Sequence, residues 1–164
     1  MADSVDAVFA TSSLTHPRPW LAIGVGGLIV GMLDLLYAII VYSPRHPILI
    51  PQTIASGVLG PRSYRDGTVS AALGLVLHFV IALGAATVYY LVSRKLTFML
   101  RRAVLCGMLY GAAVYLFMHF VVLPLSAVPS GGHTPLAYAA PEFVEHWFCV
   151  GLPIALSVRH YSPR

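Results

Sequence analysis

Long apolar runs, separated by short polar stretches, dominate the hydropathy pattern of this chain. Four runs are long or nearly long enough to cross the roughly 30 Å hydrocarbon core of a bilayer as helices. They cover residues 20–42, 69–92, 104–125 and 141–158. Trp20 and Tyr42 flank the first run as interfacial aromatics, and Pro141 suits the first turn of the last helix. The pattern therefore predicts four transmembrane helices.

The connections between these runs differ in composition. The first, 43–68, is rich in proline, yet Ile48–Leu59 within it is apolar. This stretch is too short to span a bilayer, so it predicts an interfacial or re-entrant helix on the outer side. The connection 93–103 is basic and cytoplasmic, whereas 126–140 predicts a flexible outer loop. The end segments 1–19 and 159–164 are predicted to be cytoplasmic tails, the first of them disordered.

Composition supports a membrane protein. Hydrophobic residues make up 58% of the 164 residues and charged residues only 10%, against about 25% charged in soluble domains. The net charge of +4 comes mostly from arginine, and no basic run is interleaved with aromatics as nucleic-acid binding would require. The expected partner is therefore a lipid bilayer and not a nucleic acid.

The basic residues also predict the orientation. Seven of the ten Lys and Arg residues belong to the N-terminal tail, the connection 93–103 and the C-terminal tail, and three belong to the connection 43–68. Because cytoplasmic loops carry the excess of Lys and Arg, both termini are predicted to be cytoplasmic.

One ionisable side chain lies deep inside each apolar run: Asp34, His78, His119 and His146. Such groups are costly in hydrocarbon and normally face other helices or a polar cavity. Counting along each helix places all four in the outer half of the membrane, within about two helical turns of one another. They are therefore candidates for a metal, proton or ligand site.

Small residues indicate which helix faces pack together. Asp34 shares one stripe with Gly24, Gly27 and Gly31, and His78 shares one with Gly74. The third run contains Gly107 and Gly111 at the spacing of a helix-packing motif, and His119 lies about 80° around that helix from Gly111. Glu145 lies about 100° around its helix from His146, so it is expected at the headgroup boundary. Asp34, His78 and His146 are thus predicted to point inward.

Three interpretations of this set remain open. A hydrogen-bonded Asp–His network would hold the helices in register. A proton- or ligand-handling pocket would use histidines that titrate near neutral pH. Metal or haem ligation would use imidazole nitrogens with a carboxylate, or two facing histidines. No cofactor is predicted under the first interpretation, whereas haem or a divalent metal is implied by the third.

Four segments together, 52–60, 73–79, 121–127 and 150–156, resemble an uncharacterised family of small bacterial inner-membrane proteins with four predicted transmembrane helices. The resemblance covers residues 20–160 and implies a fold and a membrane location but no chemistry. His78 and His146 match the family pattern. That pattern often has Asn where this chain has His119, which separates His119 from a shared ligand set.

The sequence thus predicts an all-α, integral membrane four-helix bundle in the bacterial inner membrane. No catalytic constellation is recognisable, so enzymatic activity is not expected. The leading functional hypothesis is a small structural or accessory protein with a buried Asp/His network, acting as a homo-oligomer or within a larger membrane complex. The alternatives are a haem- or metal-binding redox subunit and a proton-coupled small-molecule transporter.

Overall fold

The computed structural model describes residues 17–129 and 136–162, and these ranges contain helices and turns but no strand. The all-α prediction is therefore confirmed for the described residues. The helices are α1 (Pro19–Tyr42), α2 (Leu49–Leu59), the 3-10 helix η1 (Gly60–Tyr64), α3 (Gly67–Lys95), α4 (Phe98–Arg101), α5 (Ala103–Phe117), the π-helix η2 (Met118–Val122), α6 (Leu123–Leu125), α7 (Leu136–Glu145), the π-helix η3 (His146–Gly151) and α8 (Leu152–Tyr161). Most of the predicted tail 1–19 and part of the predicted loop 126–140 lie outside the described residues.

Three helical segments of the described chain are long and apolar enough to cross a membrane: Pro19–Tyr42, Gly67–Lys95 and Ala103–Leu125. Helices of this length and composition are typical of a multi-pass membrane protein. The fourth helical segment, from α7 through η3 to α8, carries Glu142 and Glu145 and is not among these three. Its crossing of a membrane stays a prediction.

The exposed face of α1 is apolar, as expected for a helix that faces lipid. Leu28, Met32, Leu36 and Ile40 recur every four residues and are 53–61% exposed. The stripe that packs against other helices consists instead mainly of small residues, such as Ala22, Gly27 and Gly31. A helix of a soluble protein buries its large apolar side chains, whereas membrane helices use small residues to approach one another.

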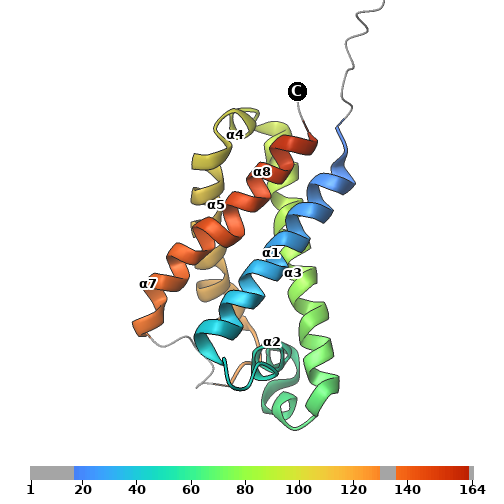
Figure 1. The fold of residues 1–164 in the computed structure, drawn as a ribbon, viewed down its shortest axis with the longest axis vertical. Coiled ribbons are helices and arrows are strands. Elements are labelled where there is room, and N and C mark those ends of the chain that lie inside the picture. The colour runs from blue at the N-terminus through green and yellow to red at the C-terminus, as the bar shows by residue number, and fades with distance from the viewer. Residues whose placement is uncertain (1–16, 130–135, 163–164) are drawn as a thin grey trace, which may run out of the picture.

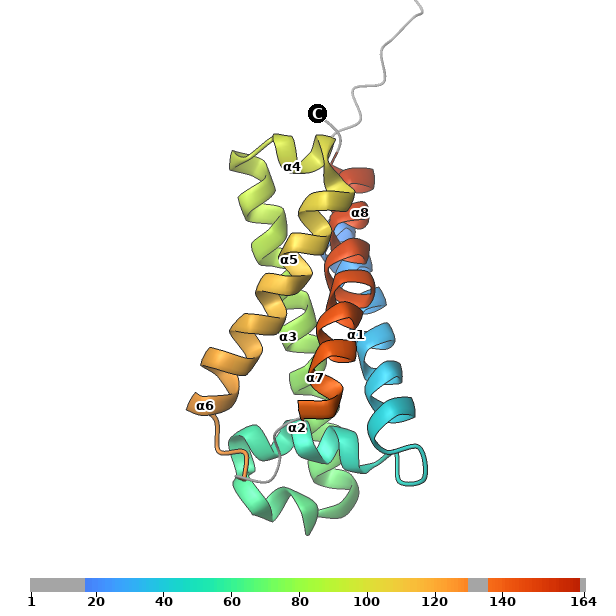
Figure 2. The same ribbon diagram turned by 90° about the vertical axis from the view of Figure 1, so that its left-hand side faces the viewer.

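The long helices lie side by side, with α1 packed between α3 and α8 and with α5 packed against η3 and α8 (Figures 1 and 2). The first and last described helices meet at one end, where the Arg18 backbone N–H donates a 2.9 Å hydrogen bond to the Tyr161 carbonyl. The connection with α4 lies at this same end, and α2 lies at the opposite end (Figure 2). The connection 93–103 therefore lies at the same end as the start of α1 and the end of α8, and the connection 43–68 lies at the opposite end.

Close helix contacts occur at five of the six glycines expected to pack. A Cβ atom at Gly27 would meet Leu83, one at Gly31 would meet Phe79, and one at Gly107 would meet Gly151 and Ala155. A Cβ at Gly74 would overlap the Pro51 carbonyl, and one at Gly111 would overlap the His146 carbonyl. At these last two positions backbone touches backbone, so no larger residue fits without a shift of a helix.

Gly24 differs from these five, because a Cβ there would meet nothing within 4 Å. Two glycines outside the predicted set have close contacts instead. Gly26 approaches Ser157 of α8, and Gly151 of η3 approaches the backbone of Gly107 and Gly111. The packing stripe of α1 therefore turns toward both α3 and α8, which a single stripe of small residues does not reveal.

The connection 43–68 contains the helix α2, which lies on α3. Gln52 donates a 2.9 Å hydrogen bond from Nε2 to the Gly67 carbonyl, and the Ser63 hydroxyl donates to the Gln52 carbonyl. Gly60 ends α2 with a φ of 62°, a conformation that favours glycine. Because its polar groups bond to the start of α3, α2 forms a fixed cap at this end of the molecule.

Candidate functional site

The four ionisable residues line a single cavity between the helices. The cavity has a volume of ≈ 250 Å³ and is lined from α1, α3, η2, α7 and η3, with Ile50, Thr53 and Ile54 of α2 at its end. Two further acidic residues, Glu142 and Glu145, also line it, and no Lys or Arg does among the described residues. The structure therefore brings Asp34, His78, His119 and His146 together around one pocket, which is otherwise mainly apolar and also holds the carboxyl groups of Glu142 and Glu145.

Asp34 and His78 face each other across the contact between α1 and α3, but they are not hydrogen-bonded. His78 Nε2 is 3.8 Å from Asp34 Oδ2, which is beyond hydrogen-bond distance. The same Nε2 is 2.8 Å from the Gly31 carbonyl oxygen, which accepts a hydrogen bond from it. His78 thus ties α3 to the backbone of α1, and the Asp34 carboxylate is left to face the pocket.

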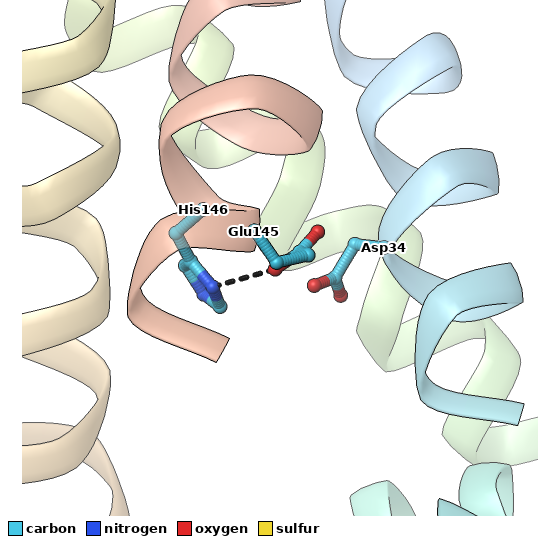
Figure 3. A group of neighbouring side chains, drawn as sticks. All are labelled: Asp34, Glu145 and His146. Carbon is cyan, nitrogen blue, oxygen red and sulfur yellow. Dashed lines mark ion pairs between the residues drawn. The ribbon is translucent and has the colours of Figure 1, made fainter. Parts of the chain in front are cut away.

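Asp34, Glu145 and His146 form the tightest group in the pocket (Figure 3). Each offers one oxygen or ring nitrogen, and these atoms all lie within 4.8 Å of one another. His146 Nδ1 is 3.0 Å from the Glu142 carbonyl oxygen and 2.8 Å from Glu145 Oε2. The contact with the carbonyl has hydrogen-bond geometry, whereas neither Glu145 oxygen has a hydrogen-bond partner among the described residues.

Glu145 is buried, so its expected location at the headgroup boundary is wrong. Its side chain is only 3% exposed, and the Cys149 thiol, a weak donor, lies beside its carboxylate. The reason is that η3 has neighbours on two sides, α1 and α5. Glu145 therefore faces Asp34 on α1 while His146, about 100° further around, contacts Tyr115 on α5.

His119 and Glu142 form a second pair on the other side of the pocket. His119 Nε2 is 3.6 Å from Glu142 Oε2, and the His119 ring stacks on Tyr115 with ring centroids 4.1 Å apart. The hydroxyl of Tyr42 lies beside Glu142 as well. His119 thus belongs to the pocket, although it is not a member of the Asp34–Glu145–His146 group.

Both π-helices start at or next to a pocket histidine. His119 is the second residue of η2 and His146 is the first residue of η3. Each histidine places Nδ1 against the carbonyl four residues before it, at 3.1 Å for His119 and 3.0 Å for His146. In a regular α-helix that carbonyl accepts the backbone N–H of the histidine itself. The imidazoles therefore stabilise local breaks in helix geometry, and π turns of this kind are frequent at functional sites.

Sequence reasoning missed Glu142 and Glu145 as pocket residues. The signal that could have found them is the spacing of Glu142, Glu145 and His146, which occupy positions i, i+3 and i+4 near one end of an apolar run. Residues at this spacing are neighbours on a helix surface. Two glutamates at this spacing from a histidine in an apolar run therefore indicate that the three side chains belong to one polar group.

The chemistry of the pocket must be inferred from its own side chains. Comparison with protein-family models, with curated proteins and with solved structures gives no match for this chain.

Proposed function

We propose that this chain is a small accessory protein of the bacterial inner membrane that binds a small cation in the pocket between its helices. The observation that carries the proposal is the buried Glu145 carboxylate, which is 3% exposed and whose Oε2 is 2.8 Å from His146 Nδ1. It lies beside a second carboxylate, Asp34. A single imidazole can balance at most one of two neighbouring carboxylate charges, and uncompensated buried charges are strongly unfavourable, so this group needs a further proton or a bound cation.

The distances favour a binding pocket over a purely structural Asp–His network. A network that holds helices in register should satisfy its own hydrogen bonds. Here the Asp34–His78 and His119–Glu142 separations are 3.8 and 3.6 Å, and the histidines donate to backbone carbonyls instead. Only Glu145, 2.8 Å from His146 Nδ1, lies within hydrogen-bond distance of a histidine, so the Asp34 and Glu142 carboxylates are not needed to hold the histidines.

The size of the cavity argues against the haem alternative. Its volume of ≈ 250 Å³ is below the range of about 300–1,000 Å³ found for pockets that hold drug-sized ligands. A haem is at least as large as such ligands. The cavity suits an ion with a few water molecules, or a very small molecule.

The proposed membrane arrangement is a four-helix bundle, with the segment α7–η3–α8 as the fourth span and with both termini in the cytoplasm. One end of the molecule contains the start of α1, the helix α4 and the end of α8, and the other end contains α2. The basic residues of the first end are Arg18, Arg94, Lys95, Arg101, Arg102 and Arg159. Those of the α2 end are Arg45, Arg62 and Arg65. The positive-inside rule then places α2 on the outer side. The pocket, which α2 closes, would face the periplasmic half of the membrane.

Thermal unfolding in detergent with EDTA present tests whether the carboxylates serve binding or structure. We expect Asp34→Asn and Glu145→Gln to keep or raise the melting temperature, because each removes one of two neighbouring carboxylate charges without changing shape. His78→Ala should lower it, because it removes an interhelical hydrogen bond of about 0.6–2 kcal/mol. The proposal fails if the two neutral variants melt as low as His78→Ala, since the carboxylates would then be structural.

A further inference from the structure

We propose that Asp34, Glu145 and His146 form a binding site for a divalent first-row transition-metal ion, such as Zn²⁺ or Mn²⁺. This inference rests on the proposed cation pocket and names the class of its ligand. The three side chains come from α1, α7 and η3, and their ligand atoms lie within 4.8 Å of one another (Figure 3). Residues from two separate helical segments thus converge on one point.

Glu145 is the residue that points to a ligand independently of the clustering. Its Oε2 is 2.8 Å from His146 Nδ1, the ion pair drawn in Figure 3, and its Oε1 accepts no hydrogen bond from the described residues. One imidazole cannot balance both the Glu145 and the Asp34 carboxylates, and a metal ion supplies the positive charge that is still missing.

His146 is already oriented as metal-binding histidines are. Its Nδ1 is 3.0 Å from the Glu142 carbonyl oxygen, and a histidine that ligates a metal commonly donates its other ring N–H to a carbonyl or a carboxylate. Donation from Nδ1 leaves the lone pair on Nε2, which is the form that binds a metal. Gly111 and Gly151 hold this part of η3 against α5, because both sit at backbone contacts.

Asp34 is the member with room to move. Its side chain is 27% exposed and borders the cavity, whereas the Glu145 and His146 side chains are only 3% and 10% exposed. Nitrogen and oxygen ligands lie about 2.0–2.2 Å from a Zn²⁺ ion, so two ligands of one ion are at most about 4.4 Å apart. The ligand atoms of this group lie within 4.8 Å of one another, so they must move slightly closer to bind one ion. A rotation of Asp34 toward Glu145 would close the site.

The ligand set selects the class of metal. Two carboxylates and one neutral imidazole carry a charge of −2, which a divalent cation balances. Mg²⁺ and Ca²⁺ prefer oxygen ligands alone, whereas imidazole nitrogen favours Zn²⁺, Fe²⁺ and their neighbours. Three protein ligands leave at least one coordination position for water or a substrate atom.

Metal titration of the EDTA-stripped protein in detergent tests the site. We expect Zn²⁺ and Mn²⁺ to raise the melting temperature of the wild-type protein and to bind with one-to-one stoichiometry by calorimetry, while Mg²⁺ does neither. Asp34→Asn, Glu145→Gln and His146→Gln should each weaken Zn²⁺ binding about tenfold or more. His46→Ala is the control, because it removes an exposed histidine that does not line the cavity, and it should leave Zn²⁺ affinity unchanged.

Several outcomes overturn the metal site. They are an absence of any Zn²⁺ or Mn²⁺ effect on the wild-type protein, an equal effect of Mg²⁺, and an equal loss of binding in His46→Ala. If Asp34→Asn and Glu145→Gln still keep or raise the melting temperature in EDTA, the cation pocket stands and only the metal assignment is lost. Should His146→Gln fail to fold, the two isosteric carboxylate variants and the wild-type titration decide the question.

Discussion

At Gly111 the backbone of α5 touches the backbone of η3 directly beside the site histidine. A Cβ atom there would overlap the carbonyl of His146 and press on the Cα of Trp147. We expect Gly111→Ala to destabilise the protein by about 1–3 kcal/mol, as overpacked cores are destabilised. Chemical unfolding in mixed detergent micelles measures this loss.

Gly24→Ala is the control for the change at Gly111. A Cβ at Gly24 meets nothing within 4 Å, so alanine should leave stability unchanged or raise it by up to about 1 kcal/mol through better helix propensity. If both variants lose stability equally, the backbone contact between α5 and η3 is not what limits position 111.

Single residues were predictable where one helix face decided their environment. Asp34 and His78 lie on stripes of small residues, and both line the pocket as their stripes indicate. Glu145 was not predictable in this way, because its helix packs against α1 and α5 at once and so has two inward faces. A one-stripe description fails wherever a short helical segment lies between two neighbours.

The position of the helix α2 depends on a glycine of α3. A Cβ at Gly74 of α3 would overlap the carbonyl of Pro51, so α2 can lie where it does only over a glycine. We expect Gly74→Ala to lift α2 from α3 and to speed backbone amide hydrogen exchange over residues 49–59, because local opening exposes these amides. Exchange within α8 should stay as in the wild-type protein.

Gly84→Ala serves as the matched control on the same helix. Nothing lies within 4 Å of a Cβ at Gly84, so exchange in α2 should not change. Unaltered exchange over residues 49–59 in Gly74→Ala would mean that α2 tolerates the shift, and the described contact would then not fix its position.

The helices themselves follow from the apolar runs, but their irregularities do not. The first three runs correspond to helices long and apolar enough to cross a membrane. The π turns η2 and η3 break the expected regular helices, and each is followed two residues later by a proline, Pro124 or Pro153. A proline removes one backbone donor from the helix, so the two Leu-Pro pairs were a usable signal for the site of each break.

At the scale of the whole molecule, the basic residues divide unequally between the two ends. The end with α4, the start of α1 and the end of α8 has six described Lys and Arg residues. The α2 end has three. Which helices pack together could not be predicted from this asymmetry, because it orders the two sides of the membrane and not the neighbours within it. The side of the membrane that the pocket is expected to face depends directly on this charge asymmetry.

Cysteine labelling from one side of the membrane tests that sidedness. Thr68 and Thr97 are exposed and lie near opposite ends of α3, and neither change to cysteine alters the charge balance. In a chain whose native Cys106 and Cys149 are replaced by alanine, we expect a membrane-impermeant maleimide to label Thr68→Cys in intact spheroplasts. Thr97→Cys should be labelled only after lysis, because the Lys- and Arg-rich end stays in the cytoplasm. The reverse pattern would place the pocket, and any cation it binds, toward the cytoplasm.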